Sequence, residues 1–261
     1  MLELNNIKVV FNEGTVNERV ALSNINLKLN KGDFVTIIGS NGAGKSTLFN
    51  AICGSLDLKE GTVYLDEENI TQKPEYQRAR FIGRLFQDPL KGTAPSMTIE
   101  ENLSIASQRG KHFSLKLFNR YNKDEYRKVL KLLDLGLEER LNTKVRTLSG
   151  GQRQALTLLM ATLVTPKLLL LDEHTASLDP LTARKILDIS NTIIKEKNIT
   201  TIMITHNMED ALKYGNKTII MKDGSILLIL EGEQRKNMNV EDLITLYSSS
   251  TNEYNDKILL K

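Results

Sequence analysis

The sequence lacks the features of a disulfide-stabilised protein and of a membrane-spanning one. Cys53 is the only cysteine among 261 residues, so no disulfide can form within the chain, and its place at the end of an expected helix indicates a small buried hydrophobe. The longest apolar runs, near residues 168–171 and 226–230, fall far short of the roughly 20 residues of a transmembrane helix. The start of the chain has no basic segment followed by an apolar one, so we expect no signal peptide and a cytosolic protein.

Positive and negative charges nearly balance. Lys and Arg number 35 and Asp and Glu 32, which gives a formal net charge of +3. A surplus this small does not indicate a nucleic-acid partner, and we expect none. With 40% hydrophobic and 26% charged residues, the chain has the composition of a globular protein that buries a sizeable core.

A glycine-rich segment follows the apolar run 34–38 and fits the pattern G-x-x-x-x-G-K-[ST]. Its glycines let the backbone turn tightly, so that N–H groups and the start of a helix near Lys45 face a phosphate. Lys45 is predicted to contact the β- and γ-phosphates, and the Ser46 hydroxyl to ligate Mg²⁺. The alternative is a glycine-rich turn that carries lysine by chance, a match expected in on the order of a per cent of such chains. The predicted nucleotide contacts are Gly39, Ser40, Asn41, Gly42, Ala43, Gly44, Lys45, Ser46 and Thr47.

Two carboxylates follow a second apolar run. Residues 168–171 are four leucines, and Asp172 and Glu173 come next. The run predicts a central parallel strand that is covered on both faces. Because open α/β sheets bind ligands outside the carboxyl ends of their strands, we expect both carboxylates beside the phosphates. Asp172 would serve Mg²⁺ through its water shell and Glu173 would act as general base on the attacking water, unless the two are only a solvated acidic pair.

A third motif, Leu-Ser-Gly-Gly-Gln at residues 148–152, opens a helical stretch that Pro166 ends. Ser149 is the expected N-cap of this helix. The N–H groups of Gly150 and Gly151 would point out of the helix start and form a second anion site, to which Gln152 also belongs.

Together these motifs resemble the nucleotide-binding subunit of ATP-binding cassette (ABC) transporters. The resemblance implies a P-loop ATPase that binds ATP and Mg²⁺, and a head-to-tail homodimer or pseudo-dimer in which the Ser149 motif of one subunit closes over ATP held by the other. It also implies that Gln87 reaches Mg²⁺ and the attacking water, that Asp179 lies in the loop that crosses the dimer interface, and that His206 senses the γ-phosphate. Without the resemblance, a lone Gln or His after a strand is only weak evidence.

Two aromatic positions leave alternatives open. Phe11 ends the first strand-like run and is the candidate for stacking on adenine, with an ordinary core phenylalanine as the alternative. His174 stands where the family usually has proline after the catalytic glutamate. We interpret it as a structural substitution, and the alternative is a titratable side chain that tunes pH dependence.

The expected fold class is α/β, a P-loop NTPase core with a mixed or parallel sheet, an antiparallel β flank and an inserted helical subdomain. Alternation in residues 7–11 and 25–29 predicts the flank, and residues 222–224 predict a turn between two strands. A helix with one apolar face is expected over 183–197. The expected domain limits are an ATPase domain over 1–247, with its core in 1–87 and 166–247 and the helical subdomain in 88–165, and a tail over 248–261 that begins with a loose linker at 248–252.

Two segments are candidates for contact with a membrane partner. Residues 109–123 contain five Lys or Arg and no Asp or Glu, with aromatic and aliphatic residues between them. They are interpreted either as a solvated loop with core anchors or as a contact with a membrane partner or anionic headgroups. Residues 88–97 follow Gln87, where the resemblance implies that the permease docks.

We therefore predict the ATP-hydrolysing subunit of a membrane transporter, held at the cytoplasmic face by transmembrane permease subunits. Residues 81–89 and 172–175 look more like importers of small solutes such as amino acids, which use an extracytoplasmic binding protein. Residues 14–29 are similar to exporters and lipoprotein-release ATPases, so that alternative stays open. A non-transport ATPase of the same superfamily is a further alternative, although no long coiled coil separates Lys45 from Ser149 and only one module is present.

Overall fold

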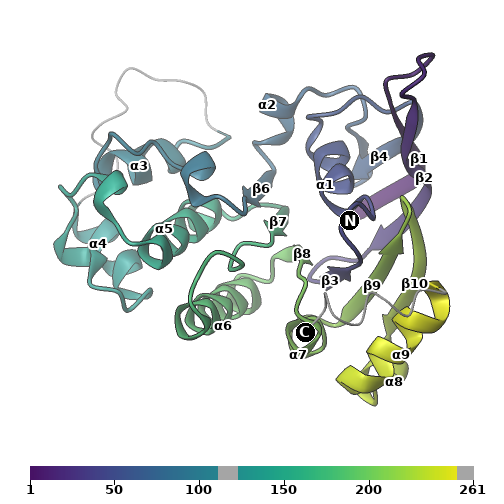
Figure 1. Cartoon of the computed structure of the whole chain (residues 1–261). Helices are drawn as coiled ribbons and strands as arrows, with labels where there is room; N and C mark the ends of the chain where they lie inside the picture. Colours follow the sequence, from purple (N-terminus) through teal and green to yellow (C-terminus); the bar gives the residue numbers. More distant parts are fainter. Residues whose placement is uncertain (111–122, 252–261) are drawn as a thin grey trace. The chain divides into compact units, whose positions relative to one another are not determined.

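The chain forms two compact units, and each is described by itself. A computed structural model describes residues 1–110 and 123–251, with side chains through residue 248. One unit, the loop unit, comprises residues 1–78 and the described residues from 200 onward, and the other, the arm unit, comprises the described residues of 79–199. Figure 1 labels their helices and strands.

An antiparallel sheet in the loop unit confirms the predicted β flank. Its strand order is β2-β1-β4-β5, and all neighbouring strands run antiparallel. Leu2 and Leu4, and after an irregularity in the strand Ile7 and Val9, are buried at every second position, because successive side chains of a strand point to opposite faces. The bounds are β1 Leu2–Phe11, β2 Arg19–Leu29, β4 Glu60–Leu65 and β5 Glu68–Asn69.

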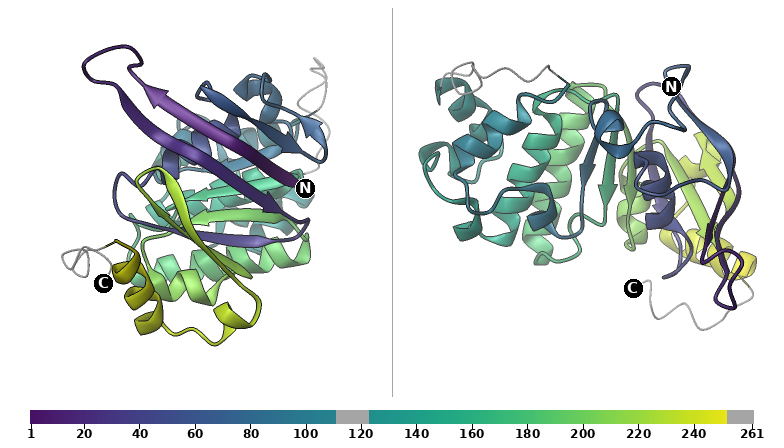
Figure 2. Two further views of the ribbon diagram at one scale, coloured as in Figure 1. Left: turned by 90° about the vertical axis from the view of Figure 1, so that its right-hand side faces the viewer. Right: turned by 90° about the horizontal axis from the view of Figure 1, so that it is seen from above.

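A mixed group of strands supports the phosphate loop in the same unit. Strand β3 (Phe34–Ile38) runs parallel to both β8 (Thr200–Ile204) and β9 (Lys217–Lys222). Strand β10 (Ser225–Glu231) returns antiparallel to β9 and also lies beside β2 (Figure 2). The predicted turn between β9 and β10 is confirmed, with Asp223 and Gly224 both at positive φ, as a two-residue hairpin turn requires. The helices of this unit are α1 Lys45–Cys53, α2 Glu75–Arg78, α7 Met208–Lys213, α8 Gly232–Lys236 and α9 Val240–Thr251.

Helix α9 corrects one expectation from the sequence. Residues 248–251, expected to start a loose linker, continue the helix to Thr251. The hydroxyl of Ser248 donates to the carbonyl oxygen of Ile244 at 2.8 Å, so the serine satisfies its own polar group inside the helix. Leu243 and Tyr247 on its inner face are buried against Ile220 and Leu230.

The arm unit is mostly helical, as predicted for its central part. Strands β6 (Ile82–Leu85) and β7 (Leu168–Asp172) pair in parallel, and every residue of β7 is buried. One apolar cluster joins the helices and includes Leu103, Leu130, Leu156 and Ile186. The remaining elements are η1 Pro89–Gly92, α3 Ile99–Ala106, α4 Lys123–Lys131, η3 Leu137–Glu139, η4 Val145–Thr147, α5 Gly150–Leu163 and α6 Pro180–Glu196.

The predicted α/β fold class is confirmed, while the predicted domain limits stay a prediction. The buried face of α6 carries Ile186, Leu187, Ile193 and Ile194, as expected.

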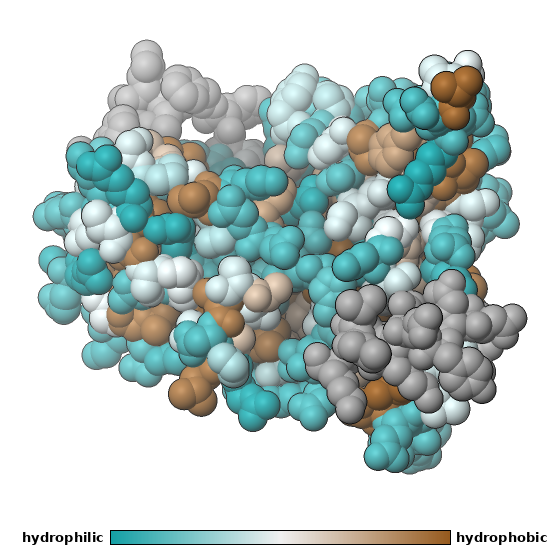
Figure 3. Space-filling model, viewed as in Figure 1, coloured by the Kyte–Doolittle hydropathy of each residue, from teal (hydrophilic) through white to brown (hydrophobic). Residues whose placement is uncertain are grey.

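Most of the basic segment 109–123 lies outside the described residues. None of the helices in the described ranges combines the length and the apolar character needed to cross a membrane. On the face in Figure 3, apolar residues stand in small groups among hydrophilic ones.

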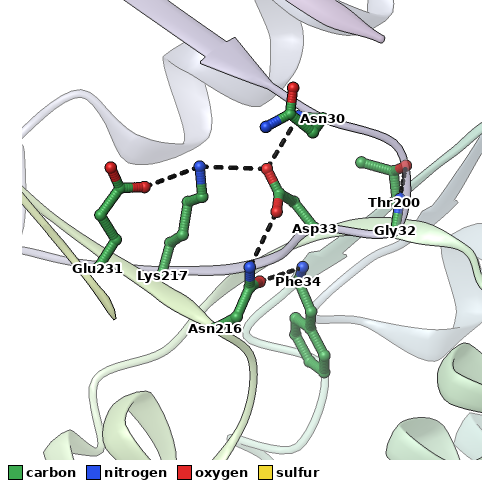
Figure 4. A network of polar contacts seen from close by, with 8 residues as sticks. All are labelled: Asn30, Gly32, Asp33, Phe34, Thr200, Asn216, Lys217 and Glu231. Carbon is green, nitrogen blue, oxygen red and sulfur yellow. Dashed lines mark hydrogen bonds and ion pairs between the residues drawn. The ribbon is translucent and has the colours of Figure 1, made fainter. Parts of the chain in front are cut away.

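A polar network joins the turn before β3 to strands β9 and β10 (Figure 4). The Asp33 carboxylate accepts hydrogen bonds from the Asn30 backbone N–H and from Asn216 Nδ2, each at 2.8 Å. The Lys217 ammonium lies 3.3 Å from Asp33 and 2.8 Å from Glu231. Burial alone would raise the pKa of Asp33, but these donors together lower it below its ordinary value.

We expect Asp33→Asn to lower the free energy of unfolding by about 1–3 kcal/mol, because it leaves Lys217 without one of its carboxylates. Since the pKa of Asp33 is lowered on folding, its contribution is complete above the ordinary value of 3.8 and is lost only as the pH falls below it. Urea unfolding at pH 7 and pH 5 should therefore give the same difference from the wild type. The exposed control Asp57→Asn should change stability little, and equal effects of the two variants would contradict the role of the network.

Candidate functional site

The phosphate loop lies between the end of β3 and the start of α1, as predicted. Gly42 and Gly44 have φ of 84° and 95°, values that favour glycine. A Cβ on Gly44 would lie 2.9 Å from the carbonyl oxygen of Ala21, and one on Gly39 would lie 2.4 Å from that of Met221. The loop can take this path only with glycine at both positions, and the path forms a cradle that suits a phosphate chain.

Lys45 is the first residue of α1 and is 5% exposed. Its ammonium donates to the carbonyl oxygens of Gly39 at 2.7 Å and Ser40 at 3.0 Å, so the side chain folds back over the loop. The hydroxyl-bearing Ser46, the predicted Mg²⁺ ligand, is exposed. The Lys45 ammonium and the Ser46 hydroxyl therefore both stand at the phosphate loop, where the sequence predicts a phosphate contact and a metal ligand.

His206 belongs to the same edge of the loop unit. Strands β3 and β8 pair in parallel with Ile37 opposite Ile204, so the residues that follow them leave the sheet side by side. The backbone N–H of Thr205 donates to the carbonyl oxygen of Ile37 at 3.1 Å. His206 thus follows its strand at the edge where the phosphate loop follows β3.

Helix α7 begins just after His206 and is fixed at its other end by Arg235, which the sequence analysis did not single out. The Arg235 guanidinium donates to the carbonyl oxygens of Ala211, Leu212 and Tyr214 at 2.7–3.0 Å, and its Nε to the hydroxyl of Thr218 at 3.0 Å. A buried cation at a helix C-terminus stabilises the exposed carbonyl groups there. Nothing in the sequence around Arg235 marks this long-range contact.

Phe11, the predicted adenine contact, ends β1 and is 37% exposed. Its partner across the strand pair is Arg19, whose guanidinium lies 3.5 Å from the position a Cβ on Gly42 would take. The end of this strand pair therefore reaches the phosphate loop within the loop unit. Sequence analysis did not single out Arg19.

Asp172 and Gln87 share one edge of the arm unit. Leu85 of β6 pairs with Leu171 of β7, so Gln87 and Asp172 both stand at the carboxyl ends of these strands. Gln87 is exposed, and Asp172 is 9% exposed. Glu173, the predicted general base, has φ of 46°, an uncommon backbone conformation for glutamate that is typical of functional sites.

An arginine that the sequence analysis did not single out pairs with Asp172. Arg84 Nη2 lies 3.0 Å from Asp172 Oδ2, and both side chains are nearly buried. The only sequence signal is a basic residue inside the otherwise apolar segment 81–86.

The glycine-rich motif at residues 148–152 begins α5, as predicted. The Ser149 hydroxyl accepts the backbone N–H of Gln152 at 3.2 Å, and the Gln152 side chain bonds the Ser149 N–H, which completes a capping box. Ser149 and Gly150 are exposed, so this helix start is open to a ligand or partner. A Cβ on Gly151 would lie 2.3 Å from Thr182 Cγ2, so a larger residue there would force the Thr182 side chain to move.

Asp179 lies close to this motif. It is the N-cap of α6, and Thr182 in the first turn of α6 is the residue that lies against Gly151. Its carboxylate accepts the backbone N–H of Thr182 at 3.0 Å. That hydrogen bond and one from the Thr182 hydroxyl lower the pKa of Asp179.

His174 is 2% exposed, which supports the structural interpretation. Its Nε2 lies 3.4 Å from the Ser190 hydroxyl, which itself donates to the carbonyl oxygen of Ile186 at 2.7 Å. The hydroxyl oxygen therefore accepts from Nε2–H. Burial lowers the pKa of His174 to about 4, so the ring is neutral at neutral pH.

Comparison with known proteins shows the family to which the chain belongs. The family described as ABC transporter matches residues 22–176. The chain is similar to the tyrosine transport ATP-binding protein of Clostridioides difficile, with 42% identity over 94% of this chain and 97% of that protein. It is also similar to the phosphonates import ATP-binding protein PhnC 2 of Oceanobacillus iheyensis, with 34% identity over 87% of this chain and 89% of that protein.

A solved structure shows the same fold. It is a dimeric ATP-binding cassette bound to ADP and phosphate after hydrolysis, with a TM-score of 0.75, 28% identity, and coverage of 88% of this chain and 98% of that one. The chain belongs to the ABC transporter family, and it is an ATP-binding subunit that hydrolyses ATP. The family and the enzyme class predicted from the sequence are therefore confirmed, whereas the roles of individual residues stay predictions.

We expect the free energy of unfolding to decrease as the pH is lowered below about 6.5, because His174 is buried as a neutral ring. The unfolded chain binds a proton near pH 6.5 and the folded chain only near pH 4, so between these values each pH unit costs up to about 1.4 kcal/mol. The variant His174→Gln lacks this proton uptake. Urea unfolding should show the stability of the variant gaining about 2 kcal/mol relative to the wild type between pH 7.5 and pH 5. Parallel stability curves would contradict a buried neutral ring.

Proposed function

We propose that the chain energises the import of an amino acid such as tyrosine through a membrane permease. The observation that carries this proposal is the 42% identity with a tyrosine transport ATP-binding protein, over nearly the full length of both chains. Similarity to a phosphonates import protein supports import over export. The alternative is the ATPase of an exporter or of a lipoprotein-release system. The experiment described below distinguishes it from an importer by the direction of transport.

The site supports the following division of labour. Lys45 binds the β- and γ-phosphates within the loop cradle, with further contacts from Ser46 and Thr47, and Phe11 stacks on the adenine. Glu173 takes a proton from the attacking water, and His206 and Gln87 respond to the γ-phosphate and to that water. Glu173, His206 and Gln87 each follow the end of a strand, and Ser46 and Thr47 lie in the first turn of α1.

The donor set fits Mg²⁺, which commonly binds through one carboxylate, a hydroxyl and the oxygens of a nucleotide. Asp172 pairs with the Arg84 guanidinium, and this contact with a cation supports a role for its carboxylate in holding positive charge. Bound there, Mg²⁺ would neutralise charge on the phosphates. Ser46, Asp172 and Gln87 are the residues that would hold it.

The exposed helix start at Ser149 and Gly150 supports a head-to-tail dimer that closes over two ATP molecules. A dimer occurs in the similar cassette with ADP and phosphate. Closure would be transmitted to permease subunits, which hold the chain at the cytoplasmic face of the membrane, and an extracytoplasmic binding protein would deliver the amino acid.

The proposal is tested by recovering the tagged Glu173→Gln chain from detergent-solubilised cells and identifying its partners by mass spectrometry. Recovery of a multi-spanning permease, followed by ATP-dependent uptake of labelled tyrosine into proteoliposomes, supports the proposal. A permease that moves solute outward refutes import. Recovery of soluble nucleic-acid or ribosomal partners alone refutes a transport role.

We expect Glu173→Gln to lower the rate of ATP hydrolysis by roughly 10²–10⁴-fold, because the amide cannot accept the proton of the attacking water. ATP affinity should be retained, and the closed dimer should accumulate in size-exclusion chromatography with ATP. The control Glu125→Gln changes an exposed carboxylate of the same unit and should hydrolyse ATP normally. A monomeric wild type with full activity would contradict the shared site.

A further inference from the structure

Arg84 and Asp172 face the same side of two paired strands. Arg84 of β6 stands opposite Leu170 of β7, and Asp172 lies two residues beyond Leu170. Because side chains two residues apart share a face of a strand, Arg84 points toward the Asp172 carboxylate. The resulting ion pair spans 3.0 Å, with the side chains only 12% and 13% exposed. Limited contact with water keeps the attraction from being strongly screened.

The same guanidinium lies over the ring of Phe86, 4.6 Å from its centroid. Cations are attracted to the face of an aromatic ring, and arginine is the usual partner. Phe86 directly precedes Gln87, the predicted contact of metal and attacking water. One side chain therefore contacts both the carboxylate that would serve the metal and the residue before Gln87.

A guanidinium and a divalent metal compete for the charge of one carboxylate. Arg84 Nη2 already lies 3.0 Å from Asp172 Oδ2, and two cations at the same carboxylate repel each other at short range. The ion pair therefore opposes metal binding at Asp172. Any shift of Arg84 away from Asp172 also changes its contact with Phe86.

We propose that Arg84 is a positioning residue that occupies the Asp172 carboxylate until Mg²⁺ and ATP are bound together, and that its release is transmitted through Phe86 to Gln87. The proposal rests on the proposed function, since it takes Asp172 as the carboxylate that serves the metal. Arg84 limits metal affinity without nucleotide and couples metal occupancy to the segment after β6.

The first test measures metal binding rather than turnover. Mn²⁺ is titrated into nucleotide-free Glu173→Gln protein, and free Mn²⁺ is followed by electron paramagnetic resonance. Arg84→Met, which removes the charge, should bind Mn²⁺ roughly tenfold more tightly. Arg84→Lys, which keeps the charge, should stay within about threefold of the parent. Unchanged or weaker binding in Arg84→Met overturns the proposal.

Two further variants sharpen this test. Arg84→Gln keeps a hydrogen-bond donor without the charge, so it should bind Mn²⁺ as tightly as Arg84→Met and serves if that variant does not fold. Arg184→Met removes an exposed arginine of the same unit and should leave Mn²⁺ affinity unchanged. Equal gains in Arg184→Met and Arg84→Met would mean a general charge effect and would overturn the specific role of Arg84.

The second test follows the segment before Gln87. The sequence contains no tryptophan, so Phe86→Trp provides a single tryptophan, which can be excited selectively over the seven tyrosines and keeps an aromatic ring beside Arg84. Adding Mg²⁺ to the ATP-bound protein should shift its emission, and the shift should be lost in the double variant Phe86→Trp/Arg84→Met. A shift that persists without Arg84 overturns the transmission step.

Different results refute the proposed function and the role of Arg84. ATP binding in the presence of EDTA is measured first for the wild type and for each variant. Failure of the wild type to bind ATP refutes the proposed function. Normal ATP binding with equal metal affinities in wild type and Arg84→Met overturns only the role of Arg84.

Discussion

The phosphate loop keeps its shape because backbone packs directly on backbone around it. Gly39 approaches the carbonyl of Met221, and Gly44 and Gly224 both approach that of Ala21 too closely for any side chain. The N–H of Gly224 also donates to the carbonyl of Ala43 at 3.1 Å. Strand β2 and the β9–β10 turn thus form the walls of the cradle, and the polar network at Asp33 fixes β9 and β10 from the opposite end of β3.

Both of the charged groups expected to meet nucleotide and metal already have partners inside the protein. The Lys45 ammonium rests on loop carbonyls, and the Asp172 carboxylate rests on Arg84. Burying either charge without compensation would be costly. Ligand binding therefore exchanges one set of partners for another, and the net free energy of binding depends on the difference between the two sets.

Local patterns in the sequence predicted those elements whose cause is local. The start of α1 at Lys45, the Ser149 cap, the buried strand β7 and the Asp223–Gly224 turn all follow from residues within a few positions. The contacts of Arg84, Arg235 and Arg19 join distant segments, and no spacing rule reveals them. The sequence does not predict the serine-rich end of α9, because serine favours loops in isolation, whereas here the buried Leu243 and Tyr247 anchor the helix.

Arg235 gives the short helix α8 an importance that its length does not suggest. A chain shortened to end at Glu231 would keep every motif of the nucleotide site, yet it would lose the guanidinium that binds the carbonyls of Ala211, Leu212 and Tyr214. Those carbonyls close helix α7, which begins at Met208, two residues after His206. The minimal piece of this protein that retains an ordered His206 segment therefore extends past the last strand, and limits drawn from the motifs alone would cut it too short.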